Sequence, residues 1–190
     1  MNKMKNKLKI KNGFSLIEML LVLGVLAVLL IAAFVVYPKV RANVIAEKEV
    51  KNIAMIQAGI SNLYKGQSSF QSLNNTLLVN AKIVPESMIS RTTNPPGIVN
   101  ESGGTVTVAG VPEYNYSQYW ITYTQVPSEV CQKLAEGLVA SSEALNVGGI
   151  QVKYHTDPQE NWKANESRVE NIGQGCNTSS NVTIIAQYAQ

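Results

Sequence analysis

A glycine and a single carboxylate stand at the head of a long apolar run, and these residue types in this order imply chemistry. Gly13 is followed by Phe14, and Glu18 is the only charged residue from that point to Tyr37. The segment over residues 14–37 is long enough to cross a bilayer as a helix, which takes about 20 residues. A charge at the edge of such a helix is costly unless something pairs with it. Glu18 therefore predicts a cationic partner.

The ends of this segment predict its orientation and its processing. The leader, residues 1–13, carries five lysines and no acid. The positive-inside rule therefore keeps the leader in the cytoplasm and exports the rest of the chain. A conventional secretory signal has its small cleavage residue after the apolar run, whereas Gly13 precedes it. Cleavage at Gly13 would therefore leave the apolar segment on the mature protein. Charge and hydropathy alone leave an uncleaved signal anchor as the alternative.

The residues Gly-Phe-Ser-Leu-Ile-Glu, from Gly13 to Glu18, resemble the processing site of type IV prepilins and related pseudopilins. The resemblance implies cleavage after Gly13 by a membrane prepilin peptidase and N-methylation of the new amino terminus of Phe14. It also implies that the apolar segment becomes the core of a filament, in which Glu18 meets the terminal amine of a neighbouring subunit. A buried charge is tolerated when an opposite charge matches it, so Glu18 is predicted to set the register of assembly.

The two cysteines of the chain, Cys131 and Cys176, predict a covalent bridge. In an oxidising compartment such a pair is most simply interpreted as one disulfide, and two free buried thiols are the alternative. Closing a loop of about 45 residues stabilises a fold by roughly 4 kcal/mol in the chain-entropy model. Two sulfurs and the single histidine, His155, match no zinc pattern, so neither a metal site nor a cofactor is predicted.

Charge argues against a nucleic-acid partner, and the motif content argues against catalysis. The whole chain carries a formal charge of +3, and removal of the five lysines of the leader leaves −2 for residues 14–190. That portion has three arginines and no basic patch interleaved with aromatics, so nucleic-acid binding is not predicted. His155 lies near Asp157 in the sequence, but a Gly-x-Ser-x-Gly nucleophile motif is missing, and no catalytic residue is predicted.

The element that must position Glu18 is one long helix over residues 14–65. Its first part, about residues 14–37, is apolar all round, as a membrane-spanning or filament-core helix must be. Pro38 predicts a kink or a new start because it removes a backbone hydrogen bond. The pilin resemblance implies that Gly24 and Pro38 bracket a stretch that loosens during filament assembly. Gly66 predicts the end of the helix.

Residues 66–190 are enough for one exported head with a modest core. The second part of the long helix is amphipathic, and its apolar face is expected to comprise Val50, Ile53, Ile56, Ile60, Leu63 and Tyr64. Its polar residues Lys48, Lys51, Asn52 and Ser61 are expected mainly elsewhere. A short helix is predicted over residues 72–82, a turn-rich loop over 92–104, and a helix over 128–146 with Ser128 as its N-cap and Cys131 on its first turn.

Four strand-like runs predict the rest of the head: residues 105–111, 116–125, 149–154 and 181–188. The predicted fold class is α+β, with an antiparallel sheet packed on the amphipathic half of the long helix. An aromatic cluster lies in and beside the second run, formed by Tyr114, Tyr116, Tyr119, Trp120 and Tyr123. For this cluster a core and sheet-face role is favoured over a sugar-binding patch.

Over essentially its whole length the chain is similar to type IVb pilins. The similarity rests on the residues LYKGQSSF at 63–70, SLNNTLL at 72–78, IVP at 83–85, and the late cysteine pair after a Val-Pro-Ser turn. It implies the type IV pilin fold, with a large exported head, a nonsequential sheet and a C-terminal region closed by the disulfide. Two features differ from that subclass: the leader is short, and Phe14 is a first mature residue more typical of type IVa pilins.

The function predicted from these features is that of a major structural subunit of a type IVb-like pilus, which mediates adhesion, aggregation or mating contact. The predicted partners are further copies in a helical filament, the prepilin peptidase and methyltransferase, the inner-membrane assembly machinery, and a host or bacterial surface receptor. The precursor is expected in the inner membrane and the mature protein in an extracellular pilus. A minor pilin, a type II secretion pseudopilin, or a signal-anchored periplasmic enzyme or binding protein are the alternatives.

Overall fold

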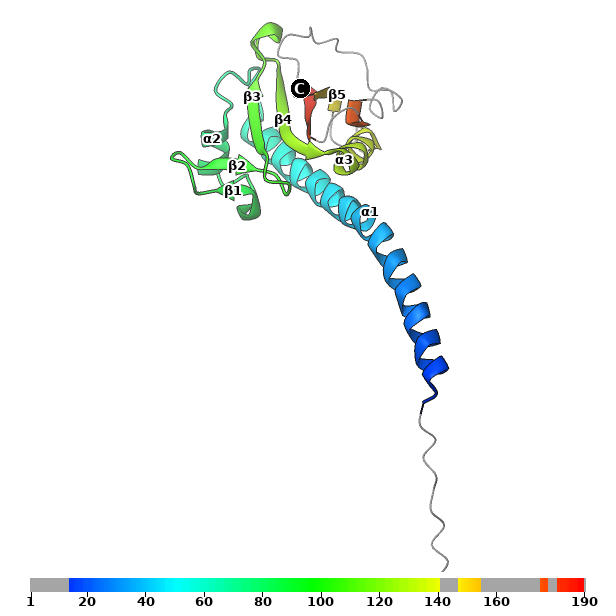
Figure 1. Cartoon of the computed structure of the whole chain (residues 1–190). Helices are drawn as coiled ribbons and strands as arrows, with labels where there is room; N and C mark the ends of the chain where they lie inside the picture. The colour runs from blue at the N-terminus through cyan, green and yellow to red at the C-terminus, as the bar shows by residue number, and fades with distance from the viewer. Residues whose placement is uncertain (1–13, 141–146, 155–174, 178–180, 190) are drawn as a thin grey trace, which may run out of the picture. The chain divides into compact units, whose positions relative to one another are not determined.

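The computed structural model describes residues 14–140, 147–154, 175–177 and 181–189. The chain divides into two compact units, residues 1–39 and residues 40–190. Helix α1, Leu16–Leu63, forms nearly all of the described part of the first unit and continues into the second (Figure 1). The predicted long helix over residues 14–65 is confirmed apart from two residues at each end.

Within the second unit, α1 buries one face in the core of the head. Ile53, Ile56 and Ile60 are completely covered, and their spacing of three and four places them on one side of the helix. Glu49 and Asn52 lie on the same side and are also buried. The prediction that Asn52 lies off the packing face is therefore wrong, because its position falls one turn before Ile56. Leu63, expected on the apolar face, is exposed at the end of the helix.

The end of α1 follows the predicted signal. The helix ends at Leu63, and the chain turns through Tyr64 to Gly66, where the Gln67 N–H donates to the Tyr64 carbonyl oxygen at 2.9 Å. Gly66 has φ +82°, a left-handed conformation that glycine adopts without a steric penalty. Gly66 is thereby confirmed as the stop.

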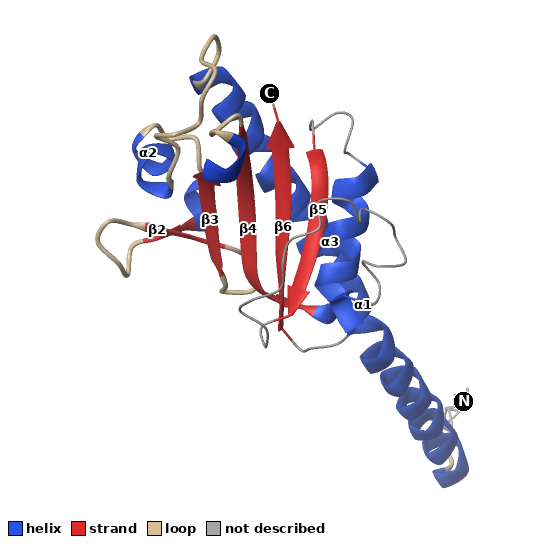
Figure 2. Ribbon diagram, turned by 90° about the horizontal axis from the view of Figure 1, so that it is seen from above, coloured by secondary structure: helices blue, strands red, loops and turns tan. Residues whose placement is uncertain are grey.

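Within the residues that the structure describes, six antiparallel strands form a single sheet, in the order β1-β2-β3-β4-β6-β5. Their bounds are Ile89–Ser90 (β1), Gly97–Val99 (β2), Thr105–Gly110 (β3), Gln118–Pro127 (β4), Val147–Tyr154 (β5) and Asn181–Ala189 (β6). The C-terminal strand β6 lies between β4 and β5, as Figure 2 shows. The sheet is therefore nonsequential, and its last strand to be synthesised is an inner one.

Helices cover one face of this sheet. Helix α3, Ser128–Ala140, packs against β4, β5 and β6, and Figure 2 shows α3 and the head portion of α1 behind the strands. Side chains from both helices and from the sheet make one hydrophobic cluster. The α+β class and the packing of sheet on helix are thus confirmed.

The two faces of β4 differ as the sequence predicts. Tyr119, Ile121 and Tyr123 are buried, whereas the residues between them are only partly covered. The inward aromatic rings belong to the core: the Tyr119 ring stacks on that of Tyr188, with centroids 5.0 Å apart, and meets Phe70 edge-on at 4.8 Å. The core role predicted for Tyr119 and Tyr123 is confirmed.

The predictions differ from the structure mainly in the short elements. Strand β2 lies inside the predicted loop over residues 92–104, and β1 was not predicted, because strands of two or three residues are too short to show alternation. Helix α2 spans only Asn75–Asn80, and the Asn74 side chain caps it by accepting from the Leu77 N–H at 2.9 Å. Single 3₁₀ turns occupy Glu86–Met88 and Pro112–Tyr114.

The helix predicted over residues 128–146 is observed as α3 up to Ala140, and residues 141–146 lie outside the described part. Helix α3 already includes Ser128, which places this residue one position inside the helix relative to the predicted N-cap. His155 and Asp157 also lie outside the described residues.

Candidate assembly interface

The apolar part of α1 is exposed along its whole length in the described part of the chain. Every residue from Phe14 to Arg41 is exposed, and Leu16 reaches 81% exposure. Among the described residues, α1 is the one helix long and apolar enough to cross a bilayer. Burying a side chain such as leucine or valine releases about 1.5–3 kcal/mol. A continuous apolar surface of this extent therefore requires a lipid or protein environment.

Glu18 lies in the first turn of α1, and one hydrogen bond positions its carboxylate. The Ser15 N–H donates to Glu18 Oε2 at 3.1 Å. Ser15 precedes the helix and Glu18 follows three residues later, which is the spacing of a capping box. A carboxylate there also faces the partial positive charge of the helix amino terminus. The Glu18 carboxylate is thus held back toward Ser15, at the beginning of the described residues.

The predicted cleavage bond precedes the helix. Gly13 lies outside the described residues, while Phe14 and Ser15 are non-helical and exposed. The structure therefore leaves the first predicted mature residues outside the hydrogen-bonded helix. The sequence analysis did not use the Ser-x-x-Glu spacing, which is the signal that would have found the Ser15 to Glu18 bond.

Gly24 and Pro38 both lie inside the continuous helix α1. A Cβ added at Gly24 would meet no atom within 4 Å, so nothing in the single chain requires a glycine there. Pro38 lies within the helix one residue before the division between the two compact units, at residues 39 and 40. The loosening of the stretch between them concerns assembly and stays a prediction.

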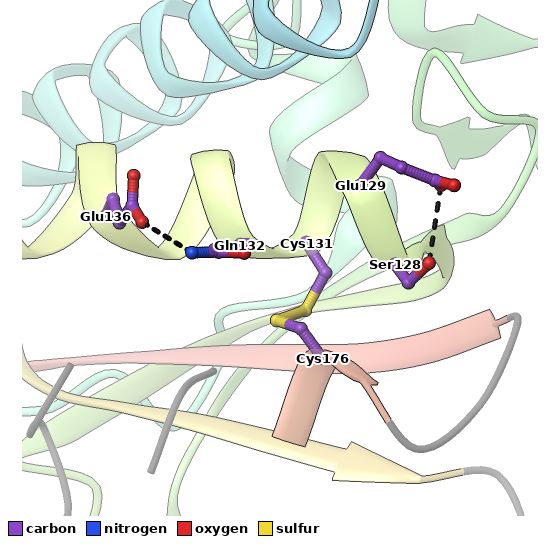
Figure 3. Close-up of a disulfide and its surroundings, with 6 residues drawn as sticks. All are labelled: Ser128, Glu129, Cys131, Gln132, Glu136 and Cys176. Carbon is purple, nitrogen blue, oxygen red and sulfur yellow. Dashed lines mark hydrogen bonds between the residues drawn. A yellow bond between two sulfur atoms is a disulfide. The ribbon is translucent and has the colours of Figure 1, made fainter. Parts of the chain in front are cut away.

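A disulfide ties α3 to the short helical turn that precedes β6 in the sequence. Cys131 on the first turn of α3 is bonded to Cys176, with Cα atoms 5.6 Å apart (Figure 3). Both residues are buried, and Cys176 lies in a short helical turn shortly before β6. The predicted bridge is confirmed, with Cys131 in the predicted place.

The outer side of α3 is polar. Gln132 and Lys133 both donate to the Glu136 carboxylate, at 3.0 Å each, and these hydrogen bonds lower the pKa of Glu136. Figure 3 shows the Gln132 contact on the helix that carries Cys131. Such a surface pair contributes little to stability, so α3 is held by its buried face and by the disulfide.

The described residues contain no cluster of three metal-binding side chains. The predicted aromatic cluster separates: Tyr119 and Tyr123 belong to the core, whereas beside β4 Tyr114 is exposed and Tyr116 is half-buried. Burial raises the pKa of the Tyr119 hydroxyl far above its usual range. In the described part of the chain, the feature best suited to a function is the apolar surface of α1, through which the protein can associate.

Two family models match the chain. The model described as PilS N terminal matches residues 43–188, and the prokaryotic N-terminal methylation motif matches residues 8–34. The second match contains the predicted cleavage bond, Glu18 and Gly24.

The proteins to which this chain is similar include two curated proteins and one solved structure. The major structural subunit of bundle-forming pilus from Escherichia coli O127:H6 (strain E2348/69 / EPEC) is 28% identical over 151 residues, covering 78% of this chain and 77% of that protein. The protein of the same description from Escherichia coli O111:H- is 28% identical over 149 residues, covering 77% and 76%. A crystal structure of a type IV b pilin from Salmonella typhi has the same fold, with a TM-score of 0.56 at 18% identity over 76% of this chain and 99% of that one.

Proposed function

This chain belongs to the PilS N-terminal family of type IVb-like pilins, and we propose that it polymerises through its apolar helix into a type IVb-like surface filament. It is a structural subunit of a pilus and not an enzyme. The observation that carries the proposal is the apolar helix surface from Phe14 to Tyr37, every residue of which is exposed. A filament in which many copies bundle these helices would bury that surface.

Maturation removes residues 1–13 and leaves residues 14–190 as the working subunit. The prepilin peptidase cuts after Gly13, and the amine of Phe14 is then methylated. The match to the N-terminal methylation motif over residues 8–34 supports this proposal, as does the non-helical conformation of Phe14 and Ser15. The precursor is anchored by the apolar helix in the inner membrane, and the mature subunit is extracted from it by the assembly machinery.

Glu18 then sets the register of assembly. Its carboxylate takes one backbone hydrogen bond from Ser15 and pairs with the Phe14 amine of an adjoining subunit. A positive charge beside the buried Glu18 carboxylate would offset the free-energy cost of burying it. Gly24 and Pro38 bracket the stretch of helix that loosens as the subunit enters the filament. The heads form the outer surface and carry the contacts with a host or bacterial receptor, in adhesion, aggregation or mating.

Mass spectrometry of filaments sheared from cells that express the chain tests the proposal. The expected subunit begins at methylated Phe14, retains the disulfide and is the most abundant protein of the filament. Replacing Gly13 with a bulky residue should block processing, whereas the same replacement at Asn12 is the matched control. An intact Met1 on protein that remains single in the membrane would refute filament assembly, and a processed but scarce subunit would identify a minor pilin.

Two substitutions at Glu18 separate charge from capping. Glu18→Gln keeps an oxygen that can accept from the Ser15 N–H but removes the charge, whereas Glu18→Ala removes both. If the charge sets the register, both variants should be processed and membrane-resident with few filaments. Normal filament yield from Glu18→Gln together with a loss in Glu18→Ala would show that capping, and not charge pairing, is what assembly needs.

A further inference from the structure

Glu49 carries a carboxylate that is buried inside the head, on the part of α1 that follows the apolar segment over residues 14–37. It is 2% exposed, and glutamate is almost never buried to this extent without a partner. Its Oε1 accepts a hydrogen bond from the Glu101 N–H at 2.6 Å. Its Oε2 is buried without a hydrogen-bond partner. Half of this carboxyl group therefore lacks the hydrogen bonds that an ionised oxygen needs.

The neighbours of Oε2 include a group that can accept as well as donate. The Asn52 Nδ2 and the Tyr123 hydroxyl are likewise buried without a partner, and both act on the Glu49 carboxyl. An ionised carboxylate can only accept hydrogen bonds, whereas a protonated one has an O–H to donate. As donors, Asn52 and Tyr123 favour the ionised form in part, whereas a proton on Oε2 would remove the buried charge and give Glu49 an O–H to donate.

Among the described residues, the charged groups around Glu49 do not neutralise its carboxylate. Lys48 on the same helix binds Glu101, with Nζ 2.7 Å from Oε1, so its charge is already paired. Glu101 itself, on the turn between β2 and β3, adds a negative charge that acts on Glu49. From the sheet, Tyr123 on β4 is the titratable group against it, and Tyr188 on β6 interacts in turn with Tyr123.

We propose that Glu49 is a buried proton-binding site that links the stability of the head to pH. The protonated form carries no charge in this buried site, and it turns the otherwise unpartnered Oε2 into an O–H that can donate. The site lies wholly within the head, so the proposal holds whether or not the chain assembles into filaments.

The direction of the pH dependence follows from the same environment. Burial raises the pKa of Glu49 above its ordinary value of 4.5, while the Glu101 N–H, the Asn52 amide and the Tyr123 hydroxyl oppose this in part. A carboxyl whose pKa is raised in the folded state contributes stability that is fully present below the ordinary pKa. That contribution is lost as the pH rises through the folded pKa, because the folded protein then gives up a proton that it held more tightly than the unfolded chain.

A carbon-13 NMR titration of the full chain in detergent micelles measures the site directly. The Glu49 side-chain carboxyl carbon is assigned in the wild-type protein by through-bond correlation to its backbone, so the test does not depend on a variant that folds. Its titration midpoint is expected above pH 4.5. A midpoint at or below that value would overturn the proposal.

Unfolding of the same full-length protein by denaturant at several pH values is the second measurement. Glu49→Gln mimics the protonated form, and Glu47→Gln, on the exposed side of the same helix, is the matched control. Between the ordinary and the raised pKa, the folding equilibrium constant of the wild type should fall about tenfold per pH unit relative to Glu49→Gln. Glu47→Gln should keep the wild-type profile. Parallel profiles for wild type and Glu49→Gln would contradict the proposal.

Discussion

Removing the disulfide should destabilise the head by an amount that the structure allows us to estimate. The bridge joins Cys131 and Cys176, which are 45 residues apart. The chain-entropy model assigns a closed loop of this size about 13 cal/mol/K of unfolded-state entropy, or about 4 kcal/mol at 25 °C. Both cysteines are buried, so replacing each with alanine also leaves a small space where the sulfur was, which adds to the loss.

That free energy corresponds to a large shift in the melting temperature. Unfolding entropies are about 2.1 cal/mol/K per residue, so a head of roughly 125 residues should lose about 15 °C in Tm for 4 kcal/mol. The bridge acts mainly on the unfolded chain, and the folded head of the double variant Cys131→Ala/Cys176→Ala should keep its secondary structure at low temperature.

Thermal unfolding of the full chain in detergent micelles, followed by near-ultraviolet circular dichroism, is the assay. The wild type under reducing conditions is the matched control, because it loses the same constraint without losing the sulfur atoms. Its Tm should fall almost as far as that of the double variant, and the reductant should not affect the double variant itself. A fall of less than about 3 °C in both samples would refute the entropic reasoning, since it corresponds to under about 1 kcal/mol.

Two substitutions in the head test its packing by denaturant unfolding of the full chain. Asn75 joins α2 to β3: its side chain donates to the Val106 carbonyl at 2.7 Å and accepts from the Val108 N–H at 2.8 Å. Asn75→Ala should lower the free energy of unfolding by about 1–3 kcal/mol, because two backbone groups lose their partner. Gly104→Ala should cost about 1–3 kcal/mol or more, since its Cβ would overlap the Thr124 carbonyl, whereas Gly24→Ala should leave the stability of the head unchanged. Equal effects of the two glycine variants would contradict the packing argument.

Local patterns predicted the elements that are long enough to show them. Strands β3, β4, β5 and β6 lie within two residues of their predicted bounds because alternation over six or more residues distinguishes two faces. The position of β6 between β4 and β5 could not be derived from periodicity, since the order of strands depends on tertiary contacts; only the resemblance to type IVb pilins implied a nonsequential sheet.

The candidate site was predictable where a short motif carried it. Glu18 follows from the motif at the head of the apolar run, and its bond from Ser15 could have been found from the capping-box spacing. The burial of Glu49 was not predicted, because a charged residue on an amphipathic helix is ordinarily placed on the solvent side. Its spacing of four and seven from Ile53 and Ile56 was the available signal.

Gly104 and Gly24 differ in whether contacts within the described chain account for a glycine at that position. In the head, Gly104 lies against the Thr124 carbonyl, and no larger residue fits there without a shift. Gly24 lies in open space in an exposed helix, where glycine costs about 1 kcal/mol relative to alanine. The exposed apolar helix and the charge of Glu18, which has no ion-pair partner among the described residues, present the same conflict between local rule and structure. Conflicts of this kind gather at functional sites. In the head, the buried Glu49 is the conflict on which the proposed proton-binding site rests. In the segment from Phe14 to Tyr37, the proposed contacts with further copies would resolve the conflict, because they would bury the apolar surface together with Glu18.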